Sequence, residues 1–383
     1  MHDVTYMQCK IAMDPKGVIM KVREGFIRIY YSFDVASEIL LEKLEKILGR
    51  KLTEAGLEYK KLTPKYIRYT TPPYLVKFGK KIIETADRKF EFNVSAKLYD
   101  FGVVSLHFEL PFEGELADLE ALSDALSENP QMEKEARKYV EKIKNDIKDA
   151  LIKPLSVSPV EDYLVFFVKS FEKEITAKEL LDKHRATVAR ILRSEGHVEL
   201  SEEEITATLS ESISYLTNDV VIVDWNAAFI YDPTKSYDTL DTLEYANVGL
   251  LELHCYDDIL DKEIDAAYDQ ITKPWRISIP FASPFASTMR RLEEVTLDVT
   301  QITERVENTL KLIGDQYLAR VYAAAVKEFH LEDWKSSIRK KLDIIKDFYE
   351  LLYNKTQTDR MIVLEVLVVL LIIFEIIITF FPH

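Results

Sequence analysis

The chain has 383 residues, of which 47% are hydrophobic and 11% aromatic, so it can bury a substantial core and can hold two or three domains. Its formal net charge of −15 argues against a nucleic-acid-binding protein, which would need a strong basic patch to overcome that charge. The two cysteines, Cys9 and Cys255, lie far apart in the sequence. This spacing fits a reducing compartment and argues against a disulfide-stabilised secreted protein.

Strand and helix patterns are mixed through the first 235 residues. Apolar stretches with strand character predict strands at residues 26–33, 66–70, 74–78, 90–98, 103–110, 163–171, 219–225 and 227–231. Helices are predicted at residues 35–48, 115–126, 132–152 and 177–193. Because the two kinds of element do not alternate regularly, as they would in a parallel sheet, we predict an α+β N-terminal domain over residues 1–235.

From about residue 236 onward the apolar residues follow helical spacing only. Three runs repeat apolar residues at intervals of three and four, at 243–271, 292–317 and 338–352. Three prolines within residues 274–284 predict a chain reversal between the first two runs, and a break near 330–334 separates the second run from the third. We therefore predict a helical, coiled-coil-like stalk over residues 236–360.

Residues 361–381 form a long apolar stretch. As a helix they would rise about 30 Å, the thickness of the hydrocarbon core of a bilayer, and only Glu365, Glu375 and Thr379 interrupt them. We predict one transmembrane helix here. The basic residues of 335–360 mark the cytoplasmic side and suit anionic lipid headgroups. Because the N-terminus lacks a secretory signal pattern, we expect a C-terminal anchor in the lipid bilayer with the bulk of the chain cytoplasmic.

Common catalytic motifs are missing from the sequence. It lacks the glycine patterns of P-loop, dinucleotide-binding and nucleophile-elbow sites, and it has neither C-x-x-C nor H-E-x-x-H. The absence of these motifs does not exclude an enzyme. It does mean that the sequence predicts no catalytic residue and no cofactor.

Residues 252–261 hold the densest group of potential metal ligands. His254, Asp258 and Asp261 share one face of a helix by i, i+4 and i, i+7 spacing, but they match no recognised ligand spacing. They are therefore either candidate metal ligands or part of a solvated helix face. Asp257 falls on the apolar seam, where we expect a Lys or Arg of a facing helix to pair with it and the carboxylate to specify the helix register.

Glu365 and Glu375 place two carboxylates within the predicted span. Ten residues separate them, so their side chains point about 80° apart on the helix. Since carboxylates inside a span usually face protein, we expect them to make helix–helix contacts in an oligomer. The alternatives are protonated or snorkelling carboxylates near the interfaces, or the lining of an ion path.

The apolar seams of 292–317 and 338–352 also favour a homo-oligomer, because they offer more apolar edge than one short hairpin can bury. The alternative is a stalk that folds back on the helix at 240–271. That arrangement would cover all three seams within one chain.

Two stretches share motifs with a known family. Residues 341–349 precede Leu364-Glu365 at the start of the apolar stretch, and Glu375 follows ten residues after Glu365. This order resembles the C-terminal end of the "required for meiotic nuclear division" family, in which a Leu-Glu-Trp opens a single span. Here Val366 stands in place of the Trp.

The second stretch, residues 98–104, resembles the Tyr-Gly-Val-Val strand of that family, whereas residues 243–257 look more like uncharacterised prokaryotic relatives. The resemblance implies a membrane-anchored protein with no established catalytic residues, which acts through assembly or partner binding.

These observations favour a membrane-tethered scaffold or interaction protein whose partners are the bilayer, copies of itself and an unknown protein. The alternative class is a membrane-anchored ligand sensor or enzyme that uses the N-terminal domain. Its sign would be a deep pocket with convergent ionisable groups. A third possibility is an ion path through an oligomer of anchors.

Overall fold

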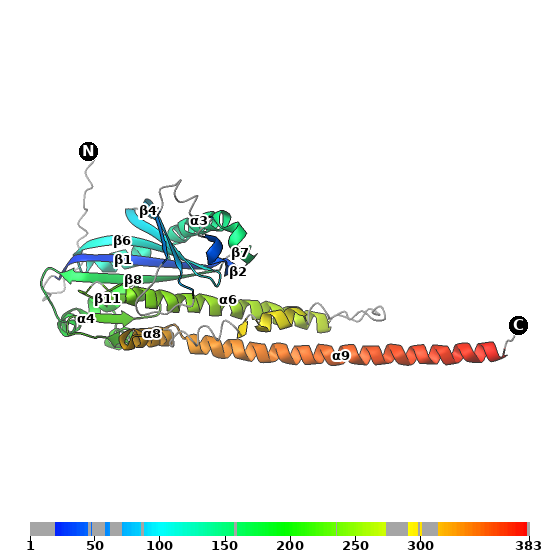
Figure 1. The fold of residues 1–383 in the computed structure, drawn as a ribbon. Coiled ribbons are helices and arrows are strands. Elements are labelled where there is room, and N and C mark those ends of the chain that lie inside the picture. The colour runs from blue at the N-terminus through cyan, green and yellow to red at the C-terminus, as the bar shows by residue number, and fades with distance from the viewer. Residues whose placement is uncertain are drawn as a thin grey trace.

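The computed structural model describes residues 20–44, 47, 58–61, 71–85, 88–156, 159–234, 236–272, 290–297, 299–300 and 313–380. Within these residues a nine-stranded sheet has the order β3-β4-β5-β6-β1-β8-β11-β10-β9 (Figure 1). Its strands are β1 (Lys21–Asp34), β3 (Glu58–Lys61), β4 (Tyr74–Thr85), β5 (Arg88–Leu98), β6 (Val103–Glu115), β8 (Val160–Phe171), β9 (Ser212–Ile213), β10 (Val220–Val223) and β11 (Ala227–Tyr231). Neighbouring strands are antiparallel except β8 and β11, which run parallel. A second sheet pairs β2 (Ala36–Ile39) with β7 (Leu151–Pro154).

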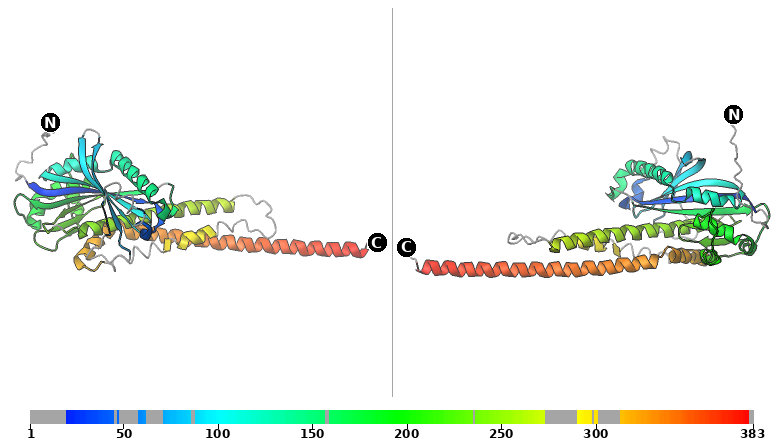
Figure 2. Two further views of the ribbon diagram at one scale, coloured as in Figure 1. Left: turned by 45° about the horizontal axis from the view of Figure 1, so that its top comes forward. Right: turned by 180° about the vertical axis from the view of Figure 1, so that it is seen from behind.

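The alternation of side chains along the strands divides the interior into two cores. In β1, Ile27 and Ile29 face one core and Phe26 and Tyr30 face the other. The first core is covered by α2 (Asp118–Leu126), α3 (Pro130–Asp146) and α4 (Ala177–Arg193). The second is covered by α6 (Asp238–Thr272), α8 (Gln316–Glu328) and α9 (Leu331–Phe380), which lie together on one side of the sheet (Figure 2). The arrangement is therefore helices, sheet and helices in three layers.

Local sequence signals explain where several helices begin. Asn129 caps α3 with its side chain, and Pro130 occupies the first turn, where its missing N–H costs nothing. Thr176 and Glu179 form a reciprocal capping box at the start of α4. Asp315 accepts hydrogen bonds from two backbone N–H groups at the start of α8. These caps fix the ends of helices whose apolar faces then pack on the sheet.

Most predicted strands lie within observed ones, and the helix predicted at 177–193 is confirmed as α4. The strand predicted at 66–70 lies outside the described residues. The helix predicted at 35–48 is wrong over its first part, because Ala36–Ile39 form strand β2. The backbone N–H of Val35 donates to the Gly102 carbonyl at 3.0 Å, and that of Ile39 donates to the Asp100 carbonyl at 2.7 Å. Pairing with distant backbone overrides the local helical spacing.

Two helices are shorter than predicted. The helix expected from residue 115 begins at Asp118, because β6 continues to Glu115. The helix expected at 132–152 ends at Asp146, and the short 3₁₀ helix η1 (Lys148–Ala150) and β7 follow it. Helix α5 (Glu202–Thr208) and strand β9 were not expected from the sequence.

The predicted break near 330–334 is confirmed, since α8 ends at Glu328 and α9 begins at Leu331. Between them His330 adopts a positive φ of 51°, which interrupts the helix. Helix α9 then joins the third apolar run and the apolar stretch in one helix of 50 residues. The second run does not continue as one helix to residue 317, because α8 starts only at Gln316.

A coiled-coil stalk over 236–360 is not shown. The first half of α6 packs directly on the sheet, and Leu243 and Leu250 share a core with Tyr30 and Tyr163. Farther along, α6 lies beside α9. The helical part of the chain therefore begins as one layer of the globular unit and continues as a helix pair.

Candidate functional site

The contact between α6 and α9 contains an ion pair at the seam position singled out in the sequence. Lys341 of α9 lies 2.8 Å from a carboxylate oxygen of Asp257 and 2.6 Å from one of Asp261. Ser337 also donates to Asp257, at 3.1 Å. Asp257 thus has the cationic partner from a facing helix that its position predicts. Its role in helix register stays a prediction.

The three candidate metal ligands do not converge. His254 Nδ1 lies 2.9 Å from a carboxylate oxygen of Glu161 on β8, and its ring meets Trp334 edge-on at 4.2 Å. Asp261 instead faces Lys341, and Asp258 is exposed. Among the described residues no group of three His, Cys, Asp or Glu side chains could hold a metal ion. The contacts of these residues join α6 to its neighbours and give the metal hypothesis no support.

A second group of charged residues lies buried between the sheet and the first turns of α6. Lys97 of β5 lies 2.6 Å from Glu244 and 2.8 Å from Asp241, both on α6. His107 Nε2 of β6 lies 2.8 Å from the other oxygen of Glu244. Lys97, His107 and Glu244 are each at most 4% exposed. These residues were not singled out in the sequence. The sequence offered little signal for them, because Lys97 and His107 occupy polar positions of two alternating strands.

The charges within this buried cluster compensate one another. Burial works against ionisation of Glu244, but His107 and Lys97 outweigh it and hold the pKa of Glu244 well below its usual range. Burial lowers the pKa of His107, although the attraction of Glu244 opposes this shift, and its Nε2–H donates to the Glu244 carboxylate. Nδ1 then accepts from the Ser95 hydroxyl, at 3.4 Å. The cluster is a polar contact that fixes α6 on the sheet.

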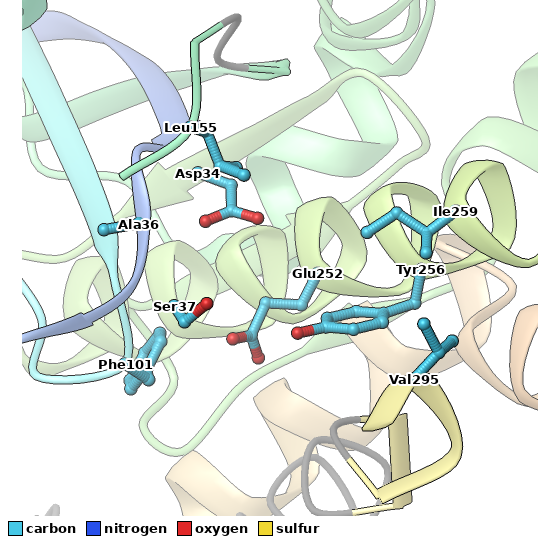
Figure 3. Close-up of a pocket in the computed structure, with 9 residues that line it drawn as sticks. All are labelled: Asp34, Ala36, Ser37, Phe101, Leu155, Glu252, Tyr256, Ile259 and Val295. Carbon is cyan, nitrogen blue, oxygen red and sulfur yellow. The ribbon is translucent and has the colours of Figure 1, made fainter. Parts of the chain in front are cut away.

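A small cavity lies farther along α6, between this helix and the end of β1 (Figure 3). It measures about 110 Å³ and is lined by Asp34, Ala36, Ser37, Phe101, Leu155, Glu252, Tyr256, Ile259 and Val295. Burial raises the pKa of Asp34 to about 7, although hydrogen bonds with Cys255 and the Ala36 backbone oppose the shift. The cavity therefore brings two carboxylates, from the end of β1 and from α6, to one partly enclosed space.

The apolar stretch forms the far part of α9. Residues Met361–Ile378 have a mean hydropathy of 3.2 and none of them is buried, so this helix is long and apolar enough to span a membrane. Glu365 and Glu375 both lie on this exposed helix. The helix–helix contacts predicted for these two glutamates would be made with other copies of the chain.

Comparison with known proteins identifies relatives of the sheet-containing part. The family model described as "Uncharacterized protein MJ0711, N-terminal domain" matches residues 24–238. The uncharacterized protein MJ0711 of Methanocaldococcus jannaschii is 26% identical over 220 residues, which cover 57% of this chain and 65% of that relative. The chain therefore spans less than two thirds of the length of this curated relative. No solved structure matches the chain. These comparisons support a prokaryotic-type family and do not show a link to the "required for meiotic nuclear division" family.

Proposed function

We propose that this chain, which belongs to the family of the uncharacterized protein MJ0711 N-terminal domain, is a membrane-tethered scaffold that holds its sheet domain at a bilayer surface. The observation that carries the proposal is the continuity of α9. Its buried residues Ile338 and Ile345 pack in the core under the sheet, and residues Met361–Ile378 of the same helix suit a hydrocarbon core.

The geometry of α9 supports a stiff tether. At about 1.5 Å per residue, its 50 residues extend roughly 75 Å, and no loop interrupts them between the core and the apolar part. A continuous helix transmits orientation as well as distance. The proposed scaffold therefore presents its sheet domain at a defined height above the membrane, on the cytoplasmic side that the basic residues of 335–360 favour.

We further propose that the scaffold is a homo-oligomer. Ile344 and Leu351 are 44% and 47% exposed and lie seven residues apart on α9, so they share one face of the helix. Glu365 lies 14 residues beyond Leu351, close to the same face. Two copies in one membrane would present this face in parallel, and burying it between chains would remove apolar surface from water and Glu365 from lipid. We also propose that the chain divides into a soluble domain at 1–235, a helical part at 236–360 and an anchor at 361–381. A kinship with the "required for meiotic nuclear division" family is likewise a proposal.

Membrane fractionation of the full chain tests the tether. Wild type should sediment with membranes and resist high salt, whereas Val369→Lys/Leu370→Lys should shift the chain to the soluble fraction. Each lysine at the centre of a span costs about 3 kcal/mol on insertion scales. Val198→Lys/Tyr215→Lys adds the same charge at exposed positions on the sheet domain and should leave the wild-type distribution unchanged. Wild type that washes off membranes with salt would contradict the proposal.

Copurification tests the scaffold function. Protein recovered with the detergent-solubilised wild type, at a fixed stoichiometry and also with the lysine control pair, would support it. Recovery of two differently tagged copies of the chain in one particle would support the homo-oligomer. A strictly monomeric particle without any stoichiometric protein partner would reject both.

A further inference from the structure

A half-buried serine lies beside the buried polar cluster between the sheet and α6. Ser95 on β5 is directly opposite His107 on β6, and the Ser95 hydroxyl lies 3.4 Å from His107 Nδ1. On the other side of the ring, Nε2 lies 2.8 Å from Glu244, which Lys97 contacts at 2.6 Å. Ser95, His107 and Glu244 therefore form a triad, in which hydrogen bonds join a hydroxyl, an imidazole and a carboxylate in that order.

The tautomer of the ring gives the triad a direction. Because Nε2–H donates to Glu244, Nδ1 carries the lone pair that accepts from the Ser95 hydroxyl. A hydroxyl, a base that can take its proton and a third group that orients the base make up an activated nucleophile. The contact between Ser95 and His107 is long, and such contacts often tighten only when substrate binds. The hydroxyl of Ser95 is thus placed to give its proton to His107.

Exposure changes along the triad as this chemistry requires. Ser95 is half-buried, whereas the side chains of His107 and Glu244 are 4% and 0% exposed. The hydroxyl is therefore the accessible end, and the base and its orienting carboxylate are shielded from water. When His107 takes a proton, the charge of Glu244 stabilises the imidazolium that forms. The contact of Lys97 with Glu244 holds that carboxylate in place.

A cation lies on the other side of the same serine. Lys77 on β4 is directly opposite Ser95, so both side chains leave the same face of the sheet, and Lys77 is exposed. Opposite residues of antiparallel strands have Cβ atoms about 5 Å apart. The long stem of Lys77 therefore allows its ammonium group to reach an oxygen atom held next to Ser95 Oγ. A positive charge at that point stabilises the oxyanion of a tetrahedral intermediate.

From the order, exposure and register of these side chains, we propose that Ser95 is the nucleophile of an acyl-transfer site that hydrolyses carboxylic esters. Ser95 Oγ attacks the carbonyl carbon while its proton moves to His107 Nδ1, and Lys77 stabilises the oxyanion. The bond to the leaving alkoxide then breaks, and the alkoxide takes the proton from His107. Water attacks the acyl-serine in the same way, which releases the carboxylic acid and restores the hydroxyl. Glu244 and Lys97 are positioning residues.

This activity goes beyond a scaffold and does not depend on one. Labelling of the full chain in detergent with diisopropyl fluorophosphate tests the nucleophile, because an activated serine displaces fluoride from this reagent. Mass spectrometry should find one label per chain, on Ser95. Ser95→Ala should abolish both the label and the hydrolysis of p-nitrophenyl acetate. Ser170→Ala removes another half-buried serine of the sheet, on β8, and should leave both unchanged.

Two further variants test the base and its orientation. His107→Gln removes the base, so the labelling rate should fall about 10²–10⁴-fold. Glu244 raises the pKa of His107, so Glu244→Gln should move the midpoint of the pH profile of the labelling rate to lower pH. A purely structural role of Glu244 would leave that midpoint unchanged.

A variant of the serine itself keeps the test valid if these substitutions unfold the chain. Ser95→Cys places a thiol beside His107, which should increase its thiolate fraction, so iodoacetamide should alkylate it about tenfold faster at neutral pH than the thiol introduced by Ser170→Cys. Peptide mapping separates these thiols from Cys9 and Cys255. Wild type without a label on Ser95, ester hydrolysis that survives Ser95→Ala, or equal alkylation of the two introduced thiols would each overturn the proposal.

Discussion

Lys97 of β5 donates a hydrogen bond to Glu244 of α6 at 2.6 Å, although 147 residues separate them in the sequence. The two side chains are 5% and 0% exposed, so the ion pair lies wholly inside the contact between the sheet and the helix. The exposed pair of Lys80 and Glu91 has nearly the same length, 2.8 Å, with side chains 68% and 54% exposed. The two pairs share their chemistry and differ in their access to water.

This difference predicts unequal effects of removing each lysine. Lys97→Met leaves Glu244 buried without its cation, so the free energy of unfolding should fall by about 3–5 kcal/mol. Lys80→Met breaks a solvated pair and should cost about 1 kcal/mol or less. Denaturant titrations of the full chain in detergent measure both changes. Similar losses in the two variants would show that the buried pair is no more important than the exposed one.

Local periodicity explains what the sequence could predict of the fold. Residues 90–98 and 103–110 largely alternate in polarity, because the apolar side chains on one face of each strand lie in the first core, whereas most side chains on the other face are polar. These strands could therefore be predicted directly. Strand β2 could not, because its conformation depends on backbone partners at Asp100 and Gly102 that lie some sixty residues away. Elements that depend on distant pairing leave little trace in local spacing.

The same physical limit applies to the candidate site. The pairing of Asp257 could be anticipated, because a carboxylate on an apolar helical seam requires a cation wherever the seam is covered. The contacts of His254 and Asp261 could not be anticipated, because the sequence does not show that β8 lies beside His254 and α9 beside Asp261. The buried cluster of Lys97, His107 and Glu244 depends on contacts between three elements and was missed for that reason.

The pair of Asp257 and Lys341 should respond to charge exchange. Lys341→Asp places like charges together at the α6–α9 contact, so it should lower stability by about 1–2 kcal/mol. Adding Asp257→Lys restores an opposite pair and should recover part of the loss, because Asp261, which also contacts position 341, still faces the new carboxylate. A double-mutant cycle from thermal melts measures the coupling. If the double variant is no more stable than Lys341→Asp, the pair does not specify this helix contact.

Gly102 and Gly79 offer a matched comparison of two glycines with positive φ. Gly102 has φ +94° in the turn between β5 and β6, and an added Cβ would lie 1.6 Å from the carbonyl oxygen of Ala36. Gly79 has φ +80°, and an added Cβ there meets nothing within 4 Å. Gly79→Ala should therefore cost about 1–2 kcal/mol, from backbone strain alone. Gly102→Ala must also displace β2, so it should cost more than about 3 kcal/mol. Equal losses of stability would mean that β2 adapts without cost.

Asp34 should make the stability of the protein depend on pH. Burial raises its pKa to about 7 from the ordinary value of 3.8, so between roughly pH 4 and 7 the folded state binds a proton that the unfolded chain has released. The free energy of unfolding must therefore fall as pH rises through this window, and the penalty is complete above pH 7. Burial also raises the pKa values of Asp162 and Asp224 to about 6, which adds to the trend in the same direction below that pH.

Asp34→Asn isolates the contribution of this one carboxyl group. At pH 8 the variant should melt about 2–5 °C above wild type, because it no longer buries a carboxylate, whereas at pH 4.5 the two should be similar, since Asp34 is protonated in the folded wild type. Asp258→Asn removes an exposed carboxylate from the neighbouring helix and should leave the pH profile of Tm unchanged. Thermal melts from pH 4.5 to 8.5 measure these profiles. A wild-type Tm that rises between pH 6 and 8, or an Asp34→Asn profile parallel to it, would show that Asp34 is ionised at little cost in the folded protein.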